Sequence, residues 1–138
     1  MPTKYVERTK SGLPAMWEAG GGMSNTGNAT IIARADGSPK SAVYVRTRGT
    51  LAGERHALIA VEPGDLVVDA DHHRYDFEIM VDQIVSINGK EAETRTLYTY
   101  SRGEWDKKPP AGVLRAVEAA REKAQCYHCR EPHYIAKS

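Results

Sequence analysis

The chain has 138 residues, of which 41% are apolar and 27% are charged, and its 19 basic and 18 acidic residues leave a net charge of +1. This length suits one domain with a hydrophobic core that needs no disulfide to fold. The near-neutral charge argues against a dedicated nucleic-acid-binding protein, because phosphate contacts normally require a clear basic excess.

The cysteines and the apolar pattern bear on where the protein resides. Both cysteines, Cys126 and Cys129, lie in one C-x-x-C, which is more typical of a metal or redox pair in a reducing compartment than of a disulfide framework. Residues 1–5 lack the apolar core of a signal peptide, and no apolar run approaches the roughly 20 residues of a membrane span. We therefore expect a cytoplasmic protein without a membrane partner.

The N-terminal region predicts two edge strands, at residues 5–9 and 14–18, followed by a glycine-rich segment. Residues 20–28 contain four glycines, which permit positive φ and close approach of the backbone to a partner. The segment lacks the Gly-Lys-Ser/Thr ending of a P-loop. A flexible connection between strands is the commoner interpretation. The alternative is a ligand-contacting loop that uses Gly21, Gly22, Ser24 and Asn25.

Residues 30–34 and 42–47 are β-branched runs on either side of a turn-rich connection, which predicts an antiparallel pair. Alternation along the second run places Tyr44, Arg46 and Arg48 on one face. Two neighbouring arginines could hold an anion, although exposed arginines on a solvated sheet face are more common.

The next segment predicts a hairpin. Residues 56–61 are nearly all apolar, which indicates a central strand covered on both faces. Pro63 and Gly64 suit the middle of a type II turn, so residues 66–70 are expected to fold straight back on that strand.

The clearest periodicity runs from residue 75 to residue 101. Apolar side chains alternate along its first arm, and Asn88-Gly89 predicts a type I′ turn that pairs Ile87 with Lys90. In that register Ile79 lies opposite Tyr98.

Three apolar residues interrupt the polar face of this predicted hairpin, namely Met80, Ile84 and Leu97. Such a face needs cover from the terminal helix or from another subunit. We therefore expect a homo-oligomer.

A helix of about residues 110–125 follows Pro109-Pro110, since proline is tolerated in a first helical turn. Its predicted buried face carries Val113, Val117, Ala120 and Ala124 at helical spacing. The fold class is therefore mainly β (α+β). We expect a single domain over residues 1–138: an antiparallel sandwich or barrel of about eight short strands, a C-terminal amphipathic helix and a short Cys/His tail.

The tail holds the densest group of metal-ligand residue types. Cys126, Cys129 and His133 form C-x-x-C-x-x-x-H, and structural zinc prefers four such ligands in a tetrahedron. His72 is the fourth ligand in this interpretation, with His73, His56 or water as alternatives. The cysteines could equally be small buried thiols. A redox role is less favoured, because a reactive dithiol usually precedes a helix and this one follows it.

The sequence contains no catalytic constellation. Gly-x-Ser-x-Gly is absent. Asp69 and Asp71 share a strand face, but such carboxylate pairs are too common to indicate acid–base catalysis. His72-His73 lacks the His-x-His spacing of cupin-like metalloenzymes, and an exposed polar turn is the commoner interpretation of that segment.

Three functions remain, in this order. The first is a non-enzymatic, oligomeric binding protein for a small anionic, nucleotide-like ligand. The second is a zinc-stabilised adaptor that binds protein or nucleic acid through Tyr127, Arg130 and Tyr134 of its C-terminal segment. The third is a cupin-like metalloenzyme that uses His56, His72 and His73.

Overall fold

The computed structural model describes residues 2–23, 26–47, 55–73 and 76–124. These residues form strands and a single C-terminal helix, which confirms the predicted fold class. The strands are β1 (Thr3–Tyr5), β2 (Glu7–Arg8), β3 (Pro14–Met23), β4 (Thr26–Ala33), β5 (Ala42–Thr47), β6 (Arg55–Ala60), β7 (Leu66–His73), β8 (Asp76–Asn88), β9 (Glu91–Ser101) and β10 (Glu104–Trp105), and the helix is α1 (Ala111–Lys123).

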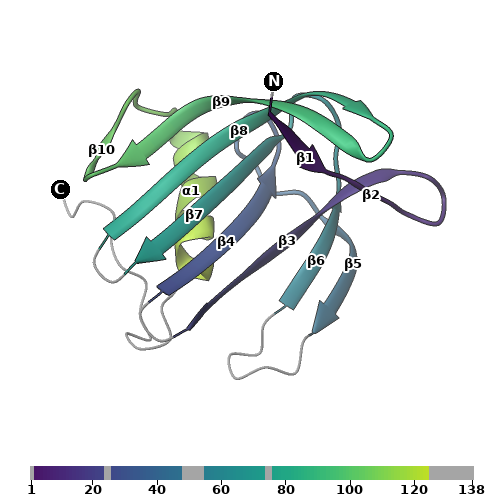
Figure 1. Cartoon of the computed structure of the whole chain (residues 1–138), viewed down its shortest axis with the longest axis horizontal. Helices are drawn as coiled ribbons and strands as arrows, with labels where there is room; N and C mark the ends of the chain where they lie inside the picture. The colour runs from purple at the N-terminus through teal and green to yellow at the C-terminus, as the bar shows by residue number, and fades with distance from the viewer. Residues whose placement is uncertain (1, 24–25, 48–54, 74–75, 125–138) are drawn as a thin grey trace.

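The strands form one antiparallel sheet of ten strands that does not close into a barrel. Its order is β1-β9-β8-β7-β4-β3-β6-β5, with β10 beside β9 and β2 beside β3. The long strand β3 belongs to two parts of the sheet (Figure 1). Residues 19–23 of β3 pair with β4 in one part, which we call the large sheet. Residues 15–18 of β3 pair with β6 in the other part, which we call the small sheet and which comprises β2, β6, β5 and this half of β3.

Hydrophobic clusters lie on both faces of the large sheet. Ile31 and Val68 pack under α1, whereas their neighbours Ile32 and Val67 pack on the opposite face, towards β6. Consecutive strand residues point to opposite faces, so β4 and β7 are covered on both sides. The apolar runs in these two strands therefore reflect two cores rather than one.

The helix packs against β4 and β7 with the face that the sequence predicts (Figure 1). Val113, Val117, Ala120 and Ala124 are all buried. Arg121 is also buried, and its Nε donates to Glu118 Oε2 at 3.0 Å. That ion pair along one helical turn gives the buried guanidinium an acceptor.

The predicted hairpin of β8 and β9 exists, but its register is different. Asn88 pairs with Glu91, so the loop residues are Gly89 and Lys90. Gly89 has a φ of 60° and Lys90 has no positive φ, as a type II′ turn requires. Bulges between Val81/Asp82 and Ile84/Ser86 lie on opposite strands and offset each other, so the position of the turn sets Ile79 opposite Tyr100 instead of Tyr98. Each bulge turns the later side chains of its own strand to the other face.

Two predicted strand pairings are wrong. The turn at Pro63-Gly64 is present, with Asp65 N donating to Glu62 O at 3.1 Å and a φ of 99° at Gly64. However, β6 pairs with β3 and β5, while β7 pairs with β4 and β8. The predicted pair of β4 and β5 is also absent. The connection from β4 to β5 and the connection from β6 to β7 each cross between the large and small sheets, and turn chemistry does not encode that crossing.

The positions of two strands within the sheet therefore differ from those predicted. β3 lies inside the sheet rather than at its edge, and β6 is the second strand from the β5 edge rather than a central strand. The first predicted strand is divided into β1 and β2 by Val6, whose fully buried side chain joins the core below β6.

Candidate functional site

The glycine-rich segment is part of a regular hairpin, which corrects its interpretation as a flexible connection. Gly21 and Gly22 lie in β3 and pair with Asn28 and Gly27 of β4. At Gly20 the reason for glycine is visible, because an added Cβ would lie 2.7 Å from Lys123 Cβ of the helix. Glycine in this strand thus permits close packing of α1. Ser24 and Asn25 lie outside the described residues.

An aromatic group that the sequence did not reveal lies on the outer face of the small sheet. The ring centroids of Trp17 and Tyr44 are 6.2 Å apart at 79°, and those of Trp17 and His56 are 6.4 Å apart at 65°. Both arrangements are edge-to-face contacts, which the charge distribution of aromatic rings favours. We call Trp17, Tyr44, His56 and Leu58 the aromatic patch.

Strand register brings the aromatic patch together. Trp17 of β3 and Tyr44 of β5 both pair with Leu58 of β6, and His56 lies two residues before Leu58 on the same strand. Paired residues of antiparallel strands share a face, as do residues two apart. The patch therefore combines three strands, and no short sequence window contains it.

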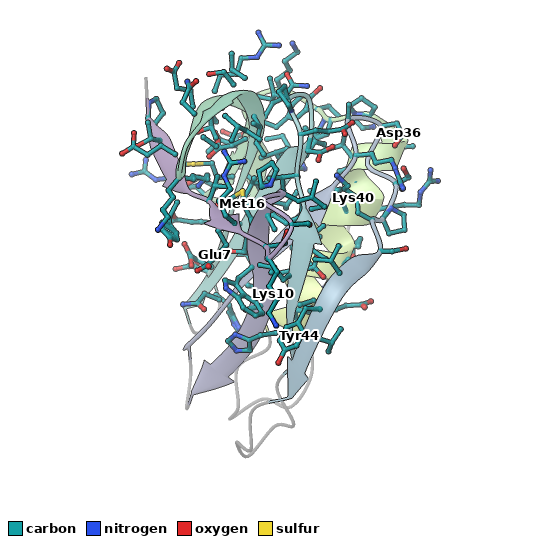
Figure 2. All side chains as sticks on the ribbon, turned by 90° about the vertical axis from the view of Figure 1, so that its right-hand side faces the viewer. Glu7, Lys10, Met16, Asp36, Lys40 and Tyr44 are labelled. Atoms are coloured by element: carbon teal, nitrogen blue, oxygen red, sulfur yellow. The ribbon has the colours of Figure 1, made fainter. Side chains whose placement is uncertain are left out.

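The aromatic patch is open to solvent on its β5 side. Tyr44 is 55% exposed, whereas Trp17, His56 and Leu58 are partly buried. A bulge between Ala42 and Tyr44 inserts Val43 as an extra residue in the strand. Figure 2 shows this side of the molecule, with Lys40 towards one end of β5 and Tyr44 towards the other.

Of the two arginines predicted to hold an anion, Arg46 is a residue of β5 and its backbone pairs with His56. This register places the Arg46 position beside the aromatic patch. Arg48 lies outside the described residues. The sequence from residue 46 to residue 55 holds three arginines and one glutamate, which is a local basic excess.

His72, the predicted fourth zinc ligand, is a fully buried residue of β7, which corrects its interpretation as part of an exposed turn. Its ring stacks on Phe77, with centroids 4.8 Å apart and planes 2° apart. Phe77 and Ala124, which follows α1, belong to the same hydrophobic cluster. Cys126, Cys129 and His133 lie outside the described residues, among which no group of His, Cys, Asp or Glu is arranged to hold a metal ion.

The histidines assigned to a cupin-like site do not come together. His56 belongs to the small sheet and contacts Trp17, whereas His72 packs on the helix side of the large sheet against Phe77. The structure does not describe the side chain of His73. The structure thus supplies no common centre for the two histidines that can be located.

The residues predicted as a subunit contact do not form one surface. Met80 is 44% exposed, but Ile84 is buried in the cluster that faces β6. Leu97 packs against the cluster beneath α1. Met80 and Ile84 still share the face opposite α1, whereas the bulge at Leu97 in β9 turns that side chain towards the helix side.

A charged network lies on the face of the large sheet opposite α1. Lys4 Nζ is 3.3 Å from Asp69 Oδ2 and 3.4 Å from Asp82 Oδ2. Thr30 Oγ1 donates to Asp69 Oδ1 at 2.6 Å, and Thr96 Oγ1 donates to Asp82 Oδ1 at 2.8 Å. Because one cation and two hydroxyls satisfy both carboxylates, the network ties β1 to the sheet rather than offering groups for catalysis.

Comparison with known proteins adds no relative: no family model, curated protein or solved structure matches this chain. Within the described parts of the chain, no helix is both long and apolar enough to cross a membrane. The aromatic patch and its surroundings are therefore the main chemical basis for assigning a function.

Proposed function

We propose that the protein is a non-enzymatic binding protein that takes a small anionic, nucleotide-like ligand on the aromatic patch. The observation that carries this proposal is the contact of Trp17 with Tyr44 and His56 beside the strand position of Arg46. Aromatic side chains stack on bases of any sequence, and arginine matches phosphate geometry with a bidentate fork.

The patch is held in the way that a ligand platform requires. Its side chains project from paired strands, so their spacing is set by backbone hydrogen bonds rather than by a loop. Trp17 is partly buried and anchors the group, while Tyr44 presents more than half of its surface to solvent. Rigid aromatic side chains lose little conformational entropy when a ligand binds.

The basic residues supply the preference for an anion. Arg46 follows Tyr44 by two positions in β5, and Arg48 follows by two more. In this proposal the arginines bind the phosphate of the ligand, and the aromatic patch stacks on its ring. Ser24 and Asn25, which follow Gly21 and Gly22 in the sequence, are proposed as further polar contacts of the ligand.

The test is calorimetry of the full-length protein against a panel of mononucleotides and dinucleotides. We expect at least one member to bind, with a change in tryptophan fluorescence. Tyr44→Ala should weaken that binding, because a stacked base contributes about 1–3 kcal/mol, roughly 5- to 150-fold in Kd.

Tyr5→Ala is the matched control, since Tyr5 is 58% exposed on β1 and lies outside the patch. The control should bind like the unmodified chain. Absence of heat beyond dilution for every nucleotide would reject the proposal, as would an equal loss in both variants.

We also propose that the C-terminal segment binds a structural zinc ion through Cys126, Cys129, His133 and His72, in an adaptor that contacts protein or nucleic acid through Tyr127, Arg130 and Tyr134. The location of His72 supports this second proposal. Its ring contacts Phe77, in the same cluster as Ala124, two residues before Cys126. Buried imidazole and thiolate are ligands that zinc prefers in closed, structural sites.

Native mass spectrometry with elemental analysis tests the zinc proposal. We expect about one equivalent of zinc, lost on Cys129→Ser and retained on His128→Ala, because a histidine between two chelating cysteines is poorly placed to bind the same ion. Less than about half an equivalent in chelator-free protein would contradict it.

A further inference from the structure

Strand β5 forms one end of the sheet, and its outer edge pairs with no other strand in the described part of the chain. Every residue from Ser41 to Val45 is exposed. Val43, Tyr44 and Val45 are 50%, 55% and 52% exposed, which makes three consecutive large apolar residues open to solvent. An isolated exposed valine needs no explanation, but a row of such residues on an open edge does.

The devices that usually protect an edge strand are scarce in β5. Residues 41–45 contain no charge and no proline, and the one irregularity is the bulge at Val43. The other end of the sheet is different, because β1 is only three residues long and carries Lys4. Natural proteins normally protect edges with charges, prolines or short strands, so an unprotected edge indicates a partner strand.

We infer that β5 pairs antiparallel with β5 of a second copy, which extends the sheet across a two-fold axis. An edge of unpaired backbone groups accepts an extended strand, and two identical strands satisfy each other in an isologous contact. The uncharged stretch from Ser41 to Val45 can face itself without placing like charges opposite each other.

The charges at the ends of the strand are compatible with this pairing. In an antiparallel pair centred on the uncharged stretch, Lys40 of one copy lies near Arg46 of the other. Lys40 Nζ lies 2.5 Å from Asp65 Oδ2, and only 14% of the Lys40 side chain is exposed. Because Asp65 neutralises Lys40, repulsion between the ends of the two strands is reduced.

The dimer also changes the binding surface, and this consequence alone depends on the proposed function. A two-fold axis perpendicular to the sheet keeps corresponding faces on the same side. The aromatic patches of the two copies then lie on one continuous face, with the two Tyr44 residues closest to the axis. A ligand with two rings, such as a dinucleotide, is the class that this paired surface fits best.

The test measures the mass of full-length protein without ligand, by light scattering after gel filtration and by analytical ultracentrifugation. We expect twice the 15.2 kDa of one chain. The double variant Val43→Lys/Val45→Lys should be monomeric, because lysines on an edge strand oppose pairing. Met80→Lys and Val85→Lys, which change exposed apolar residues of β8, should remain dimeric.

Hydrogen exchange provides a second measurement that needs no variant. The outward-facing amides of β5 should be protected at high protein concentration and exchange faster on dilution to the monomer. A monomeric unmodified chain, or a dimer that survives both lysines in β5, would overturn the inference. Because no nucleotide is present, either result leaves the test of ligand binding independent.

Discussion

At the scale of single residues, Lys4 is the group whose chemistry the structure explains most fully. Desolvation of its partly buried ammonium lowers the pKa, but the charges of Asp69 and Asp82 and their hydrogen bonds outweigh this effect and raise the pKa above its ordinary value of 10.5. Asp82 is nearly buried and therefore depends on Lys4 and Thr96 for compensation.

Replacing this residue, Lys4→Met, should lower the free energy of unfolding at neutral pH by about 1.5–3 kcal/mol, the usual contribution of hydrogen bonds to charged groups. Urea unfolding measures the difference. Lys90→Met is the matched control, since Lys90 is exposed and forms no ion pair within the described part of the chain. Equal losses in the two variants would contradict the role of the network.

The pH dependence of the same difference has a defined sign. Because the pKa of the Lys4 ammonium is raised in the folded state, its interactions stabilise the protein fully at pH values below the unfolded-state pKa of 10.5. This stabilisation is lost as the pH rises through the folded-state pKa. The advantage of the unmodified chain over Lys4→Met should therefore be constant from pH 7 to about pH 10 and shrink above about pH 10.5. A difference that grew above that pH would contradict the assignment.

At the scale of secondary-structure elements, α1 docks through close glycine contacts at both of its ends. A Cβ at Gly112 would lie 2.1 Å from the backbone oxygen of Asp36, and one at Gly37 would lie 2.0 Å from the oxygen of Gly112. The turn before β5 and the first turn of the helix thus touch backbone to backbone. At the other end of the helix, Gly20 allows the same close approach to Lys123.

The substitution Gly112→Ala should destabilise the protein by about 1–3 kcal/mol, because the added methyl group overpacks the contact. Intrinsic helix propensity predicts the opposite sign, a gain of up to about 1 kcal/mol. Ala119→Gly, at an exposed helical position, calibrates that propensity in the same helix. Thermal unfolding decides the matter, and stabilisation by Gly112→Ala would exclude the close approach.

The elements also differ in how well the sequence predicted them. The helix was predicted with its buried face, because small apolar residues recur at helical spacing and proline precedes them. The register of β8 and β9 was not, because Gly89-Lys90 rather than Asn88-Gly89 forms the turn and no local sequence pattern marks the two bulges.

At the scale of the whole molecule, the division of the sheet decides where function is proposed. The two halves of β3 pair with different strands, so Trp17 joins β5 and β6 while Gly20 joins α1 and β4. One strand thereby contributes to the helix-side core and to the aromatic patch. Likewise β5, which the sequence paired with β4, becomes a free edge and the proposed dimer contact.

The sequence by itself determined the local features: a β-rich chain, its turns at Gly64 and near Gly89, the helix with its buried face, and the tail with Cys126 and Cys129. These depend on interactions between residues close in the chain, which periodicity and turn chemistry report. Only the tertiary structure decided that Trp17, Tyr44 and His56 meet and that β5 is an edge. Those facts depend on pairings between distant strands, where several partners satisfy the same local pattern and the packing of the two cores selects one.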